Sequence, residues 1–287
     1  MTDSFYKRIL RAAGAFLVPA VVSLSAIPLS AAETDTLPRP VTSVYRLEAG
    51  ASSAQSTYLS PVKYTGSGFT LSGEWSKAFN KCPDHIVMRF AGSGTFRDML
   101  NPASTARMLG IEAMFNWGMA WRQRLPHDLQ ISAGADIEIS GGALYLPRNG
   151  NNPVTAMAFA GLDLNFSIGW HSRIGRLPFV VSDRIAIPSL GTFFSPQYGE
   201  SYYEIYLGNH KGLAHCGWWG NHFGIDNLLS VKLDFGRTAM EIGYRYRLHT
   251  EYANGLNTHV ITNAFVIGII PHGLGLKKRK NANYSVY

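Results

Sequence analysis

Four long segments of the chain alternate between apolar and polar residues with a period of two. Between 109 and 121 the apolar side chains occupy the odd positions, and Glu112, Asn116 and Gly118 lie between them. The segments 129–140, 155–171 and 240–249 follow the same pattern. Successive side chains of a β-strand point to opposite faces, so each segment is predicted to form a strand with one apolar face.

The length of these segments favours strands that cross a membrane. A strand of a globular protein usually has about five or six residues, whereas a tilted strand that crosses a bilayer needs roughly 9–11. Backbone groups cannot stay unpaired in hydrocarbon, so such strands must close into a barrel. We therefore predict an all-β fold, an antiparallel transmembrane β-barrel with its apolar face outward.

The strands are separated by two alternating classes of link, as in barrels with short periplasmic turns and longer outer loops. Short links are expected near 79–84, 124–128, 172–176 and 235–237, and longer ones at 51–65, 141–153, 189–225 and 250–257, with one of intermediate length at 100–106. The strands between them number about ten: 42–50, 66–79, 85–99, 107–124, 128–141, 154–171, 177–188, 226–235, 238–250 and 258–270. A hairpin at Tyr202–Tyr206 within the 189–225 link would make twelve.

Three tryptophans give a check that is independent of the strand boundaries. Trp75, Trp121 and Trp170 lie on the apolar face, and each lies near a short link. Tryptophan is enriched at membrane–water interfaces. The sequence therefore predicts an aromatic girdle at one end of the barrel.

The N-terminal residues 1–32 have the features of a signal peptide. Lys7, Arg8 and Arg11 precede an apolar run, and Ser30-Ala31-Ala32 supplies the small residues of a cleavage site. Residues 33–41 are then expected to be a periplasmic segment before a barrel at 42–270. Residues 271–287 form a basic tail, which Pro271 separates from the last strand.

Composition narrows the class of protein further. Charged residues make up 16% of the chain, below the roughly 25% of ordinary soluble proteins. The net charge of +7 could indicate nucleic-acid binding. An exported chain has little access to nucleic acid, and its one dense basic run, 277–280, lies in the tail. We expect no nucleic-acid partner, and outer-membrane lipid as the surroundings of the barrel.

Several stretches resemble a family of uncharacterised outer-membrane barrel proteins from Bacteroidetes, catalogued as domain of unknown function 3316. The resemblance lies in Leu37–Tyr45, Thr57–Pro61, Arg148–Pro153 and Phe194–Tyr206. It implies a location in the cell envelope, in the outer membrane, and supports the barrel. It implies no activity, substrate or site residue.

Charged residues on the polar face should converge inside the barrel. This set consists of Glu74, Arg89, Glu112, Arg122, Asp136, Glu138, Asp163, Arg184, Lys232, Glu241, Arg245 and Arg247. Unpaired buried charges are costly, so these groups are expected to pair across the lumen. A plug of ion pairs is favoured over the selectivity lining of a narrow pore, because about ten strands leave little space inside.

The 189–225 link holds a group of aromatic and histidine side chains that suits an envelope lipid or glycan. Its members are Tyr202, Tyr203, Tyr206, His210, His215, Trp218, Trp219 and His222. The simpler interpretation is an ordered loop that folds over the barrel mouth. The spacing of these histidines matches no zinc pattern, so no metal or cofactor is predicted. The loop Arg148–Pro153 has the composition of turns, and a sugar contact there stays open.

Two pairs of residues bear on alternative functions. His171 and Ser172 invite comparison with barrel lipid hydrolases, but adjacent residues of a strand point to opposite faces. Cys82 and Cys216 are predicted at opposite ends of the barrel, too far apart for a disulfide.

The sequence thus favours a non-enzymatic outer-membrane barrel that binds a small ligand or lipid, forms a narrow pore, or has a structural role. One alternative is an outer-membrane lipid hydrolase. Another is a soluble periplasmic, lipocalin-like binding protein, which would turn its apolar face inward around a ligand. The sequence does not identify the ligand.

Overall fold

A computed structural model describes residues 41–236 and 238–271. The predicted signal peptide, the segment 33–40 and the tail 272–287 lie outside the described residues. The elements, in chain order, are β1 (Val41–Ser56), β2 (Ser60–Ala78), β3 (Ile86–Leu100), β4 (Arg107–Leu125), β5 (Leu129–Tyr145), β6 (Val154–Ile174), β7 (Leu177–Phe194), α2 (Tyr202–Tyr206), β8 (Ala214–Trp218), β9 (His222–Asp234), β10 (Thr238–Ala253) and β11 (Leu256–Pro271).

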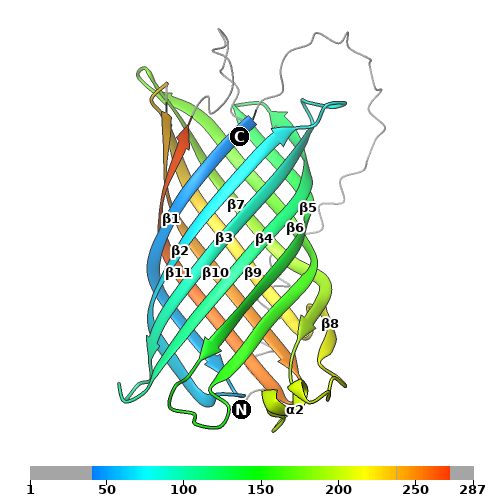
Figure 1. The fold of residues 1–287 in the computed structure, drawn as a ribbon. Helices are drawn as coiled ribbons and strands as arrows, with labels where there is room; N and C mark the ends of the chain where they lie inside the picture. The colour runs from blue at the N-terminus through cyan, green and yellow to red at the C-terminus, as the bar shows by residue number, and fades with distance from the viewer. Residues whose placement is uncertain (1–40, 237, 272–287) are drawn as a thin grey trace. The chain divides into compact units, whose positions relative to one another are not determined.

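Ten long strands close into an antiparallel barrel (Figure 1). Each strand from β1 to β7 pairs with the next, β7 then pairs with β9, and β9, β10 and β11 follow. The circle closes because β11 pairs with β1 from Tyr45↔Ile269 to Ser56↔Thr258. The predicted fold class, an all-β antiparallel barrel of about ten strands, is confirmed.

The prediction of two additional strands is wrong. Tyr202–Tyr206 forms the short helix α2, and Ser201 and Glu204 make a reciprocal capping box at its N-terminus. The five residues of β8 pair only with Leu190–Phe194 of β7. The strand β8 therefore extends the edge of β7 beyond the region that pairs with β9.

Two of the predicted long links, 51–65 and 250–257, are also wrong. Strand β1 continues to Ser56 and β2 begins at Ser60, because backbone pairing persists beyond the apolar stripe. Strands β10 and β11 are joined by Asn254 and Gly255 alone, at φ values of 52° and 74°. Two successive positive φ values are those of the type I′ hairpin turn, which favours Asn-Gly.

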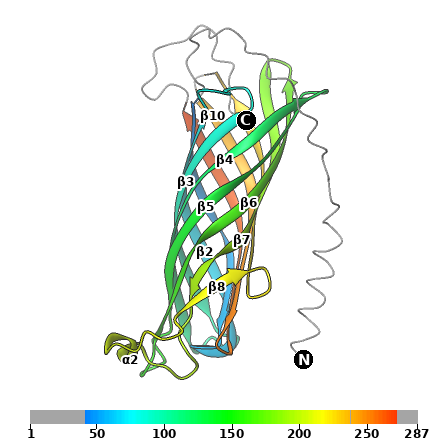
Figure 2. The same ribbon diagram turned by 90° about the vertical axis from the view of Figure 1, so that its right-hand side faces the viewer.

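The two ends of the barrel differ. We call one the loop end, because it carries the links 101–106 and 146–153 and the segment 195–221 with α2 and β8. We call the other the turn end, which carries 79–85, 126–128, 175–176 and 235–236 together with the first and last described residues. Figure 2 shows α2 and β8 towards the same end of the barrel.

The outer surface of the strands is a continuous apolar band. Large apolar side chains on the outward face are exposed, among them Leu71 at 57% and Ile139 at 56%. Trp75, Trp121 and Trp170 are exposed on the same face towards the turn end, as the girdle prediction required. The lipocalin-like alternative does not fit, because it needs this apolar face inside.

Among the described residues, no helix has the length and apolar character to cross a membrane.

Candidate functional site

A layer of buried ion pairs crosses the middle of the lumen. Arg46 lies 2.9 Å from the carboxylate of Glu74 and 2.5 Å from that of Glu241. Arg184 also contacts Glu74, at 2.9 Å, and Lys232 lies 3.8 Å from Glu241. The side chains of Glu74 and Glu241 are 1% and 0% exposed, so each carboxylate depends on these cations for compensation.

Further pairs extend this layer towards the loop end. Arg245 contacts Glu48 at 2.8 Å and also pairs with Asp226. Arg247 contacts Glu48 at 3.1 Å and Asp226 at 3.5 Å. Two more pairs involve β3: Arg97 contacts Glu112 on the neighbouring strand β4, and Arg89, nearer the turn end, contacts Asp136 two strands away on β5. The ion pairs that the sequence favoured are therefore present across the lumen.

Glycines explain how pairs two strands apart can meet. Gly268 stands opposite Arg46 on one side and Glu241 on the other. A Cβ atom at Gly268 would lie 3.0 Å from Oε2 of Glu241 and 3.3 Å from Cγ of Arg46. Gly118 stands in the same way between Arg89 and Asp136. Each glycine leaves the space over which an arginine reaches its carboxylate.

The remaining acidic candidates gather on β5 and β6. Asp136 stands directly opposite Asp163, and Glu138 lies two residues along β5 on the same face. Glu138 accepts a hydrogen bond from Asn116 at 3.4 Å. The Oδ1 atom of Asp163 is buried and has no hydrogen-bond partner among the described residues. Of these three carboxylates, Asp136 is compensated by Arg89.

The predicted set of converging charges was incomplete and had one wrong member. Arg122 does not reach the central layer, because its guanidinium donates to the carbonyls of Pro83 and Asp84 in the 79–85 link. The sequence reasoning missed four members of the layer: Arg46, Glu48, Arg97 and Asp226. The alternation around Tyr45 and Leu47, both exposed, would have placed Arg46 and Glu48 inside.

A second, apolar layer fills the lumen at the loop end. It consists of Ala54, Leu59, Tyr64, Met99, Ala106, Met108, Leu144, Leu146, Met157 and Val260. Met99, Met108 and Leu144 have no exposed surface. The sequence predicted that the polar face of the strands lines the lumen, and it did not foresee this apolar layer. An ion that entered the lumen here would lose its hydration without gaining polar partners.

Helix α2 covers part of the loop end and is held there by two tyrosines. Tyr58 donates a hydrogen bond to the carbonyl of Glu200 at 2.7 Å, and its ring meets that of Tyr202 edge to face. The Tyr202 hydroxyl accepts a hydrogen bond from the backbone of Ala156 at 2.6 Å. Burial, with Tyr202 and Glu200 nearby, raises the pKa of Tyr58 to about 12. Tyr202, a candidate ligand-binding residue, thus also holds helix α2 against the barrel.

A cavity of about 440 Å³ lies between α2 and the 146–153 link. Its lining is formed by Asn151, Asn152, Pro153, Val154, Ser201, Tyr202 and Tyr203. Of the other loop candidates, His210 is exposed and does not line this cavity. Trp218 stands beside Leu190 on the outer surface, and Trp219 donates to the carbonyl of Pro188 at 2.7 Å. These two tryptophans therefore lie outside the cavity.

The structure also places the two residue pairs that bear on a lipid hydrolase and on a disulfide. His171 and Ser172 stand opposite Val180 and Phe179 in regular register, so their side chains point to opposite faces of β6. This geometry gives a hydrolase no nucleophile–base contact at that position. Cys82 and Cys216 are both free thiols, as predicted.

The comparison with protein families decides the family of the chain. A family model described as a protein of unknown function, DUF3316, matches residues 15–280. The chain belongs to this family. No curated protein matches it.

Several solved barrels are similar in fold at low sequence identity. The transport unit of the autotransporter AIDA-I from Escherichia coli is 9% identical and has a TM-score of 0.45, with 94% of this chain and 98% of that chain covered. The β domain of the Bordetella autotransporter BrkA is also 9% identical, with a TM-score of 0.40 and coverage of 81% and 99%. The translocator domain of NalP from Neisseria meningitidis is 8% identical, with a TM-score of 0.37 and coverage of 94% and 96%.

Proposed function

We propose that this DUF3316 protein is an outer-membrane barrel that does not conduct ions and that binds a carbohydrate at its loop end. The outward apolar band supports insertion into a bilayer, and the predicted signal peptide supplies the export that this location requires. The loop end then faces the outside of the cell, since the first and last described residues lie at the turn end. An origin in Bacteroidetes remains a prediction from the resemblance.

The closed lumen supports the absence of conduction. A permeating ion would have to pass both the apolar layer at the loop end and the ion-paired layer beyond it. The carboxylates of the ion-paired layer are already compensated by arginine and lysine. The lumen therefore resembles a packed interior more than an aqueous path.

The composition of the 440 Å³ cavity supports a carbohydrate as ligand. Its lining combines the side-chain amides of Asn151 and Asn152 with the rings and hydroxyls of Tyr202 and Tyr203. Amides and hydroxyls hydrogen-bond sugar hydroxyls, and aromatic rings cover the apolar face of a sugar. The observation that carries the proposal is this contrast between a filled lumen and an open, neutral, polar–aromatic cavity at the loop end.

Conductance is the first test of the proposal. The mature protein, inserted into a planar bilayer, is expected to give no stepwise increase in current, because the apolar layer leaves no hydrated path. Insertion is verified separately by recovery of folded protein from the bilayer lipid. Reproducible conductance steps from the folded protein would contradict the closed lumen.

Binding is the second test. The wild-type protein is expected to retain oligosaccharides released from the surface glycolipid of the cell that produces it. Tyr203→Ala or Asn152→Ala removes a cavity side chain and should weaken retention by about tenfold, the loss of roughly one good hydrogen bond or ring contact. Tyr206→Ala is the matched control, because Tyr206 is 84% exposed on the same helix and does not line the cavity. If Tyr203→Ala and Tyr206→Ala weakened oligosaccharide retention equally, the cavity would not be the binding site.

A further inference from the structure

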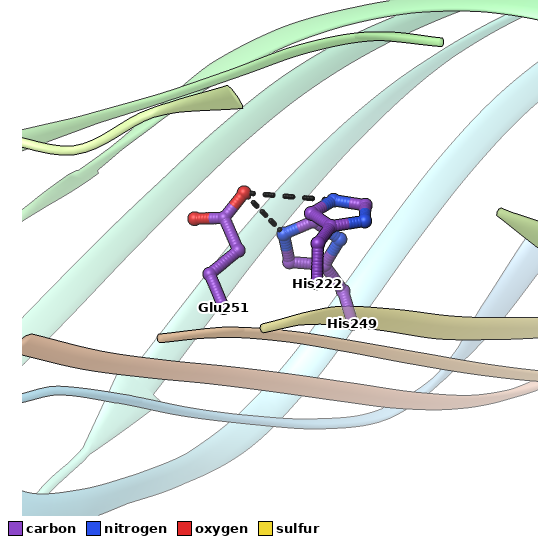
Figure 3. A group of neighbouring side chains, drawn as sticks. All are labelled: His222, His249 and Glu251. Carbon is purple, nitrogen blue, oxygen red and sulfur yellow. Dashed lines mark ion pairs between the residues drawn. The ribbon is translucent and has the colours of Figure 1, made fainter. Parts of the chain in front are cut away.

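Three potential metal ligands meet inside the barrel towards the loop end (Figure 3). His222 is the first residue of β9, and it stands directly opposite Glu251 in the pairing of β9 with β10. His249 lies two residues before Glu251 and so shares its face of β10. The strand register, and not the spacing along the chain, brings these residues together.

The distances within this group suit one small cation. Oε1 of Glu251 lies 2.9 Å from Nε2 of His249 and 3.8 Å from Nε2 of His222. One ligand atom from each of the three residues lies within 4.8 Å of the others. A tetrahedral ion with bonds of about 2.0–2.1 Å needs its ligand atoms roughly 3.3 Å apart. The observed separations of 2.9 and 3.8 Å lie on either side of that value.

The potential ligand atoms are buried, and one of them has no hydrogen-bond partner among the described residues. The side chains of His222 and Glu251 are 2% and 7% exposed. Nε2 of His222 makes no hydrogen bond to any described residue, whereas Nε2 of His249 and Oε1 of Glu251 lie 2.9 Å apart as an ion pair. Buried polar atoms are almost always hydrogen-bonded. An ion pair between His249 and Glu251 accounts for two of these atoms but leaves Nε2 of His222 without a bond, whereas a cation uses all three.

The surrounding side chains hold His222 in its orientation. Its ring stacks on Phe159 at 4.2 Å between centroids and 8° between planes, and Phe193 lies 5.5 Å from it. The ring of His249 meets it edge to face at 5.0 Å. A ligand fixed in this way loses little side-chain entropy when it binds a metal.

Space for one more ligand adjoins the group. A cavity of about 20 Å³ is lined by Glu112, His249 and Glu251 together with apolar and small residues. This volume is enough for one water molecule. A metal-bound water there would face the carboxylate of Glu112, which belongs to β4 and pairs with Arg97 at 2.5 Å.

We propose that His222, His249 and Glu251 form a binding site for a divalent transition-metal ion, with Zn²⁺ as the best match. Two imidazole nitrogens, one carboxylate oxygen and a position open to water are the donor set of many zinc sites. Mg²⁺ and Ca²⁺ prefer oxygen donors alone. The sequence-based prediction of no metal rested on the spacing of His210, His215 and His222, which did not include the partners on β10.

Titration of the purified protein tests the site directly. The mature chain is prepared without a histidine tag, folded in detergent, stripped with a chelator and titrated with Zn²⁺ in a calorimeter. We expect saturation at about one Zn²⁺ per chain, since the three ligands form one tetrahedral set. Co²⁺ in place of Zn²⁺ should give the intense visible absorption of a four-coordinate ion.

The variants H222A and E251Q each remove one ligand. Each should weaken Zn²⁺ binding by more than the roughly 10- to 100-fold that loss of a supporting group costs. H210A is the matched control, because His210 is an exposed histidine of the adjoining segment 195–221, and the variant should bind Zn²⁺ like the wild type. The wild-type titration needs no variant, so the proposal stays testable if H222A does not fold. Absence of saturable Zn²⁺ binding to the wild type, or equal losses in H210A and H222A, would overturn it.

Discussion

Glu74→Gln is expected to destabilise the folded barrel by about 3–5 kcal/mol, the cost of breaking a buried ion pair from one side. Glu74 is the shared partner of Arg46 and Arg184, and its side chain is 1% exposed. The amide keeps the shape of the side chain but removes the charge that compensates two buried guanidinium groups. The measurement is the free energy of unfolding in urea, with the protein folded in lipid vesicles.

An exposed ion pair provides the control for this prediction. Arg107 and Asp98 pair at the loop-end edge of β3 and β4, where their side chains are 60% and 35% exposed. Asp98→Asn should change the free energy of unfolding by no more than about 1 kcal/mol, as is usual for surface pairs. If Glu74→Gln cost as little as Asp98→Asn, the ion-paired layer would be hydrated and the lumen open.

Phe115→Arg should destabilise the membrane-inserted barrel by about 2–4 kcal/mol, the cost of a cation on the lipid face near the middle of a bilayer. Phe115 lies near the middle of β4, and it is 49% exposed on the outward face. In water the same change would be harmless, because an exposed arginine is readily hydrated. The urea-unfolding measurement in vesicles again gives the value.

The position of the arginine is the control in this second experiment. Ile174 is 67% exposed but is the last residue of β6, beside the turn at 175–176. Ile174→Arg should cost about 0–1 kcal/mol, because the side chain reaches the aqueous interface. Equal effects of Phe115→Arg and Ile174→Arg would mean that no depth-dependent lipid environment surrounds the strands.

The strands and their outward faces could be predicted because each depends on a local pattern. The alternation between 109 and 121 alone determines which side of β4 is apolar, and Phe115 and Trp117 are exposed on that side. The extent of the strands could not be predicted in this way. Strands β1 and β2 continue past their apolar stripes, and the energy there comes from backbone pairing, to which side-chain hydropathy gives no guide.

The partners inside the lumen could not be predicted, because they depend on register and closure. Arg46 and Glu241 lie 195 residues apart in the chain. They meet only because β11 separates their strands and presents Gly268 between them. Helix α2 did have a local signal, the capping box of Ser201 and Glu204, which the aromatic residues between them obscured.

The group formed by His222, His249 and Glu251 depends partly on a local pattern and partly on strand register. The spacing of His249 and Glu251 places them on one face of any strand, so two of the three residues could be grouped from the sequence. The addition of His222 required the register of β9 against β10. The segment 219–221 between β8 and β9 sets where β9 begins, and no periodicity indicates that position.

Fluorescence quenching of Trp117 tests most directly whether the apolar face of the barrel meets lipid. Trp117 lies on the outward face near the middle of β4, and the other five tryptophans are replaced by phenylalanine. Brominated acyl chains should quench its emission strongly, while acrylamide in the water should quench it weakly. Strong quenching by acrylamide with none by brominated lipid, from a chain that stays monodisperse in buffer without detergent, would contradict a membrane-spanning barrel.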